Sequence, residues 1–187
     1  MYSALRNTIK DVSVLKHYNS SENSFYIKED DKLAKCKRVT LVNFESETTT
    51  FGFELDCKKI KCERLHKLSP YFQDSKDLDK GNDAIIFTTI GGNYYIFVVE
   101  LKDDSNSKEI IKQFKSTTCF IDYLKSILKN IYKIKLDDIA IKYLVFSTHG
   151  NNLKLTKSVK LQPVKREDLL IYHLNCNQAK VSIKSFI

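Results

Sequence analysis

The stretch KGNDAIIFTTIGGNYYIFVVELKDDSNSKEIIKQFK, residues 80–115, carries the strongest fold signal in this chain. Residues 84–90 and 94–101 are almost continuously apolar and rich in β-branched and aromatic side chains, which is typical of central strands covered on both faces. A Gly-Gly-Asn turn at residues 91–93 joins them. The pattern therefore predicts a β-hairpin in the middle of a sheet.

The segment after the hairpin predicts a crossover to a further strand. Residues 110–131 repeat apolar side chains at the period of a long helix, and residues 139–147 form another strongly apolar stretch. A strand, a helix and a strand in this order predict a parallel pair with a right-handed connection. We therefore expect an α/β fold with a mixed central sheet flanked by helices.

Weaker patterns extend this core on both sides. Residues 2–17 place apolar side chains at roughly helical spacing and predict an amphipathic first helix. Further short strands are expected at residues 39–44, 48–55, 153–160, 169–176 and 180–186. The first two are expected to form an early hairpin on the sheet, and the last three to extend the sheet edge or form a C-terminal hairpin.

The segment before the central hairpin is basic and then polar. Residues 57–68 fit either a short helix or an irregular connection, whose lysines would border a nucleic-acid site or simply form a solvated face. Residues 69–80, with Pro70 and clustered Asp and Lys, predict a loop. His149 follows a predicted strand and is interpreted as a loop residue.

The composition describes one basic domain spanning residues 1–187, 42% of them hydrophobic. The formal net charge of +8, from 31 Lys and Arg against 23 Asp and Glu, favours a polyanionic partner such as nucleic acid. Five cysteines without a CxxC pair predict a reduced, cytoplasmic protein without a structural zinc site. No apolar run approaches the ~20 residues that span a bilayer, so no membrane partner is expected.

Asp83 begins the first strand of the central hairpin and Glu100 ends the second. Ile90 and Asn93 flank the turn, and Asp83 and Glu100 each lie seven residues further from it. A symmetric register therefore places the two carboxylates opposite each other. Like charges in this position destabilise a sheet unless a cation lies between them. Hard carboxylate oxygens favour Mg²⁺ or Mn²⁺, which also bind phosphate oxygens.

Lys102 follows Glu100 by two positions, so the strand period places both side chains on one face. A lysine there can orient or deprotonate an attacking water, or neutralise negative charge that develops on phosphoryl oxygens. The combination predicts metal-dependent hydrolysis of a phosphodiester bond.

At these residues the sequence resembles the PD-(D/E)xK nuclease superfamily, over a core of about residues 50–148. The resemblance implies a restriction-endonuclease-like core and a nuclease that uses Mg²⁺ or Mn²⁺ on DNA, with RNA as the alternative, in defence, restriction or repair. By this resemblance, Asp83 and Glu100 bind the metal and Lys102 is the catalytic lysine.

The same resemblance assigns roles to residues outside the central motif. The main-chain carbonyl of Leu101 would add a metal ligand, and Gln113 would support the site from the following helix. Glu63 would add an acidic ligand from the segment before the hairpin. Asn82 stands where the family pattern has proline.

Simpler interpretations stay open at the same residues. A Glu-x-Lys sequence at a strand end is commonly a solvated ion pair, and Gln113 and Glu63 could be ordinary surface residues. The chain could also be a non-catalytic nucleic-acid-binding or protein-interaction subunit that keeps the nuclease fold. A nuclease of this size could act as a homodimer or within a larger complex.

Overall fold

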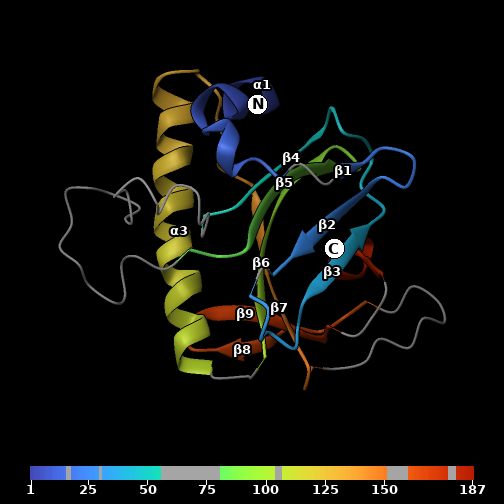
Figure 1. Cartoon of the computed structure of the whole chain (residues 1–187). Coiled ribbons are helices and arrows are strands. Elements are labelled where there is room, and N and C mark those ends of the chain that lie inside the picture. Colours follow the sequence, from blue (N-terminus) through green and yellow to red (C-terminus); the bar gives the residue numbers. More distant parts are fainter. Residues whose placement is uncertain (16–17, 30, 56–80, 104–106, 151–159, 177–179) are drawn as a thin grey trace.

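The computed structural model describes residues 1–15, 18–29, 31–55, 81–103, 107–150, 160–176 and 180–187. They form three layers (Figure 1). A six-stranded mixed sheet is the middle layer, with helices on one face and a four-stranded sheet on the other. The chain is therefore a mixed α/β protein, as the pattern of strands and helices predicts.

The central sheet has the strand order β4-β5-β6-β7-β9-β8. Its strands are β4 Thr50–Phe53, β5 Ala84–Ile90, β6 Asn93–Lys102, β7 Ala140–Ser147, β8 Val164–Arg166 and β9 Leu169–Asn175. The strands β4, β5 and β6 are antiparallel neighbours, whereas β6, β7 and β9 run parallel. Antiparallel β8 completes the sheet beside β9.

The β5–β6 hairpin has the predicted symmetric register. Ala84 pairs with Val99 as its outermost pair, and continuing by one residue on each strand places Asp83 opposite Glu100. The turn consists of Gly91 and Gly92, with φ values of 56° and 79°. A two-residue type I′ turn needs positive φ at both positions, which glycine adopts without strain.

The crossover from β6 to β7 is the long helix α3, Ser107–Asn130, which confirms the helix predicted at residues 110–131. It joins the predicted parallel pair. Its apolar side packs on the central sheet together with the short helix α1, Tyr2–Thr8. None of the helices in the described ranges is both long and apolar enough to cross a membrane.

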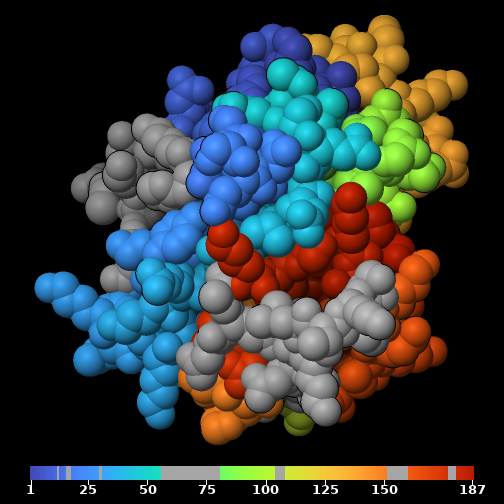
Figure 2. Space-filling model, turned by 90° about the vertical axis from the view of Figure 1, so that its right-hand side faces the viewer, coloured from blue at the N-terminus to red at the C-terminus, as the bar shows by residue number. Residues whose placement is uncertain are grey.

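The four-stranded sheet covers the face opposite α3 and has the order β1-β2-β3-β10. Its strands are β1 Tyr18–Asn19, β2 Ser24–Lys28, β3 Arg38–Val42 and β10 Val181–Ser182. Phe25 and Leu41 from this layer share one buried cluster with Phe97 and Val99 of β6. Figure 2 faces this layer, where the blue and cyan N-terminal segments meet the red C-terminal segment. The expected flanking helices thus cover one face of the central sheet in the described part of the chain, and a second sheet covers the other.

The first helix is shorter than predicted. Instead of spanning residues 2–17, α1 ends at Thr8, and Asp11–Ser13 form the 3-10 helix η1. The N–H of Leu15 then donates to the carbonyl of Gly52 at 2.9 Å. The edge of β4 offers backbone groups that need partners, so the chain pairs with this edge and does not continue as a helix.

The hairpin predicted from residues 39–44 and 48–55 is also wrong. Strand β3 pairs with β2 and β10, whereas β4 pairs with β5 in the other sheet. Both segments alternate apolar residues in the sequence, but all four residues of β4 are buried, whereas β3 buries only every second residue. The sequence pattern alone therefore does not decide which strand pairs with which.

The C-terminal tail agrees with the prediction only in part, because it adds a short edge strand, β10, to the four-stranded sheet. Only Val181–Ser182 pair as a strand, with β3, and Ile183–Phe186 form the 3-10 helix η2 with Ile183 and Phe186 buried. The strand predicted at 169–176 is confirmed as β9. The predictions for residues 57–68, 69–80 and 153–160 lie outside the described residues.

Candidate functional site

The open end of the β5–β6 hairpin brings three predicted site residues to one face of the central sheet. Ile96 and Val98 of β6 pack in the cluster that contains α3. The alternation of a strand places Glu100 and Lys102 on the same helix-facing side. Asp83, opposite Glu100 in the register, points to this side too, because paired residues of antiparallel strands share a face.

Glu100 is a buried carboxylate that three side chains hold. Its side chain is 3% exposed, and Oε1 lies 2.9 Å from Nζ of Lys102. Gln113 donates from Nε2 to the same oxygen at 2.9 Å, and Asn82 donates from Nδ2 to Oε2 at 2.6 Å. The Glu-x-Lys pair therefore has a buried acid, unlike a solvated pair at a strand end.

Asn82 is fixed in turn by helix α3. Thr117 donates from Oγ1 to Oδ1 of Asn82 at 2.5 Å, and neither residue has exposed surface. Gln113 and Thr117 are four positions apart and so lie on one face of the helix. Helix α3 thus controls both oxygens of Glu100, one directly through Gln113 and the other through Asn82.

Asp83 accepts the backbone N–H of Leu101 on Oδ2 at 2.6 Å. The residue as a whole is half-buried. Burial, followed by the negative charge of Glu100, raises the pKa of Asp83 well above its ordinary value, and the Leu101 hydrogen bond opposes this only in part. Two ionised carboxylates are therefore unfavourable here without added positive charge.

The one ammonium at these carboxylates among the described residues is that of Lys102. Burial lowers the pKa of Lys102, but the charge of Glu100 and the hydrogen bond to it outweigh this effect and leave the pKa above its ordinary value. Burial likewise raises the pKa of Glu100, against the opposing effect of Lys102. At neutral pH the described site therefore has one ammonium for two carboxyl groups.

A buried acceptor beside Glu100 has no partner among the described residues. Gln113 is 8% exposed, and its Oε1 accepts no hydrogen bond there, while its Nε2 is occupied by Glu100. A water held by a cation could donate to this oxygen. The carboxylates of Asp83 and Glu100 and the carbonyl of Leu101 are hard oxygen donors of the kind that Mg²⁺ and Mn²⁺ prefer.

The donor chemistry therefore fits a divalent cation. Within the described ranges, no three His, Cys, Asp or Glu side chains gather closely enough to hold a metal by themselves. Glu63, the predicted additional acid, lies outside the described residues, as do the basic residues of 57–68. The side chain of Leu101 is buried between the two sheets, so only its main chain could contribute to the site.

Ser147 and His173 lie beside this group on the next strands. The β6–β7 register pairs Lys102 with Ser147, whose Oγ lies 2.7 Å from Nε2 of His173. Burial, and then the charges of Arg166 and His149, lower the pKa of His173. Ser147 has no exposed surface, so its hydroxyl is not an accessible nucleophile. His149 is exposed in the turn after β7, as predicted.

Sequence reasoning missed two residues of this network. It treated Asn82 only as a departure from proline, and it did not single out Thr117. A usable signal was present, because Thr117 follows Gln113 by one helical turn and therefore lies above the same strand ends.

The chain was compared with protein families, curated proteins and solved structures. No protein-family model, curated protein or solved structure matches the chain. The resemblance to PD-(D/E)xK nucleases therefore remains an expectation from the sequence of the hairpin end.

Proposed function

We propose that the chain is a metal-dependent nuclease that hydrolyses phosphodiester bonds of DNA at Asp83, Glu100 and Lys102. The observation that carries the proposal is the buried contact of 2.9 Å between Glu100 and Lys102 next to a second carboxyl group. Buried charged groups cost free energy to maintain, and groups with shifted pKa values cluster at functional sites.

In this proposal, Asp83 and Glu100 hold Mg²⁺ or Mn²⁺ together with the carbonyl of Leu101. Such an ion, when bound, lowers the pKa of a water and offsets charge on phosphate oxygens. The contacts from Gln113 and Asn82 keep the Glu100 carboxylate from rotating. A fixed carboxylate loses less entropy when it binds a ligand, which favours catalysis.

Lys102 acts as a cation in this proposal and not as a base. The charge of Glu100 keeps the proton on Nζ at neutral pH. The Lys102 side chain is 31% exposed, so a phosphate group can approach it while Glu100 stays buried. Its proposed role is to stabilise the negative charge that develops on the phosphoryl oxygens in the transition state.

A second candidate function is a non-catalytic nucleic-acid-binding or protein-interaction subunit. The observation that favours it is that protein donors already contact both oxygens of Glu100. The network would then only stabilise the end of the hairpin, and nucleic acid would bind without hydrolysis.

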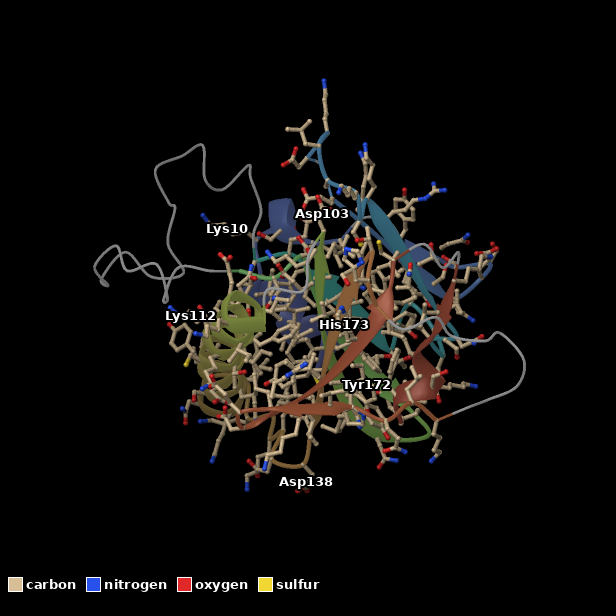
Figure 3. All side chains as sticks on the ribbon, turned by 90° about the horizontal axis from the view of Figure 1, so that it is seen from below. Lys10, Asp103, Lys112, Asp138, Tyr172 and His173 are labelled. Atoms are coloured by element: carbon tan, nitrogen blue, oxygen red, sulfur yellow. The ribbon has the colours of Figure 1, made fainter. Side chains whose placement is uncertain are left out.

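A plasmid-nicking assay with Mg²⁺ or Mn²⁺ separates the two functions. The wild type is expected to nick or degrade DNA, and Asp83→Asn and Glu100→Gln to abolish this activity because each removes a charge while keeping the side-chain shape. Asp138→Asn is the matched control, since Asp138 is exposed before the opposite end of β7 and lies far from Asp103 in Figure 3.

Thermal melting of each variant must accompany the assay. Loss of nicking in the two site variants at unchanged melting temperature supports the nuclease. Equal nicking by the wild type and both site variants contradicts it, and binding without nicking by any of the proteins favours the second candidate.

A further inference from the structure

The connection from β2 to β3 comes near the candidate site, because the charge of its Glu29 acts on the carboxyl group of Asp83. We name its residues 31–37 the loop arm. The backbone N–H groups of Lys35 and Cys36 donate to Oδ1 of Asp103 at 2.5 and 2.9 Å. Asp103 directly follows Lys102 at the end of β6, so these two bonds fasten the loop arm to the strand that carries the site.

The loop arm has a defined conformation of its own. The N–H of Leu33 donates to Oδ1 of Asp31 at 3.0 Å, and the N–H of Ala34 donates to the Asp31 carbonyl at 3.2 Å. Cys36 anchors its end in the core between the sheets, with 1% exposure. The loop arm is therefore held at a fixed place relative to Lys102.

The outer side of the loop arm is basic. Lys32, Lys35 and Lys37 are exposed. The acids described in this connection are Glu29, whose charge helps to raise the pKa of Asp83, and Asp31, whose carboxylate accepts the N–H of Leu33. Leu33 is 88% exposed, which shows that this side does not pack on the fold. In Figure 3 the light-blue loop between β2 and β3 extends beyond Asp103 at the end of the molecule that faces the viewer.

We infer that the loop arm is the surface that holds the phosphate backbone of duplex DNA next to Asp83 and Glu100. The inference rests on the proposed nuclease function and adds the form of the substrate and its point of contact. Lysine side chains bind phosphates through charge and release counterions. The loop arm has no aromatic residue on which an unpaired base could stack, so the backbone of a duplex fits it better than single-stranded DNA.

The salt dependence of DNA binding tests this inference without any hydrolysis. Fluorescence anisotropy with a labelled DNA duplex, in EDTA, yields log K against log salt for each protein. Lys32→Ala/Lys35→Ala is expected to reduce the slope by about 1.8, because each lost phosphate contact removes about 0.9. Lys129→Ala/Lys135→Ala removes the same charge near the far end of α3 and is expected to leave the slope unchanged.

Equal slopes for the two double variants, or a wild type that does not bind duplex DNA, would overturn the inference. A slope change seen only with the corresponding single strand would also contradict it. Because no divalent metal is present, the result is independent of catalysis. If the wild type nicks DNA but the two double variants have equal slopes, only the loop-arm inference is wrong. If Lys32→Ala/Lys35→Ala reduces the slope but the wild type does not nick DNA, only the proposed nuclease function is wrong.

Discussion

The hydroxyl of Thr117 donates to Oδ1 of Asn82 at 2.5 Å, and Asn82 passes this constraint to Oε2 of Glu100 through a bond of 2.6 Å. A helix residue thus fixes the orientation of a carboxylate that it does not touch. This relationship makes Thr117 a positioning residue of the proposed site.

Two replacements of Thr117 distinguish the effect of its hydroxyl group from the effect of its side-chain shape. Thr117→Val is expected to lower the nicking rate about 10- to 100-fold, because groups that orient a metal ligand typically have effects of this size. It also leaves a buried acceptor on Asn82 without its donor, which costs about 1–3 kcal/mol of unfolding free energy. Thr117→Ser keeps the hydroxyl and is expected to restore Mn²⁺ affinity, measured by calorimetry. Equal Mn²⁺ affinities of Thr117→Val and Thr117→Ser would show that the hydroxyl of Thr117 does not position the site.

Replacing Lys102 tests the buried ion pair. Lys102→Met keeps most of the length of the side chain but leaves Glu100 without its ammonium, so we expect the unfolding free energy to fall by about 1–3 kcal/mol in urea titrations. The nicking rate is expected to fall about 100-fold or more. Lys129→Met, at an exposed position on α3, should stay within about 0.5 kcal/mol of the wild type. Wild-type stability and activity in Lys102→Met would show that the pair of Lys102 and Glu100 contributes neither to folding stability nor to hydrolysis.

His173 makes stability depend on pH in the acidic range. Its pKa is lowered in the folded chain, by burial first and then by Arg166 and His149. Between that lowered pKa and about 6.5, the unfolded chain binds more protons than the folded one, so stability is full above this interval and falls as the pH drops through it. His173→Gln should flatten this part of the curve of melting temperature against pH. Curves of identical slope would contradict the assignment.

Gly52 lies where the two sheets approach each other. A Cβ at this position would come within 2.9 Å of Cδ1 of Leu15 and 3.2 Å of the ring of Phe25. Gly52→Val should therefore lower the unfolding free energy by about 1–3 kcal/mol through overpacking. Gly92→Asn is a suitable control, because asparagine tolerates positive φ and a Cβ there meets nothing within 4 Å. Equal stability of the two variants would mean that the sheets do not meet at Gly52.

The central hairpin and its crossover could be predicted because their signals are local. The apolar runs around Gly91 and Gly92 set the strands and the register, and this register alone brings Asp83 and Glu100 together. The 3.6-residue period sets α3 in the same way. These features need no knowledge of distant parts of the chain.

The remaining errors involve choices between distant partners. The sequences of strands β3 and β4 have similar alternation, and no neighbouring residue decides that β3 joins β2 while β4 joins β5. The contact of Thr117 with Asn82 spans 35 positions and depends on how α3 packs over the sheet. Helix α1 ends early because Leu15 finds a backbone partner on Gly52, which the period of residues 2–17 does not reveal.

Anomalous diffraction from crystals soaked in Mn²⁺ locates a bound cation without an activity assay. One strong anomalous peak is expected within coordination distance of the carboxylates of Asp83 and Glu100, and this peak should disappear in Glu100→Gln crystals grown in the same form. Crystals of active wild-type protein without a peak at these carboxylates, or with the same peak in Glu100→Gln, would contradict the proposed metal site.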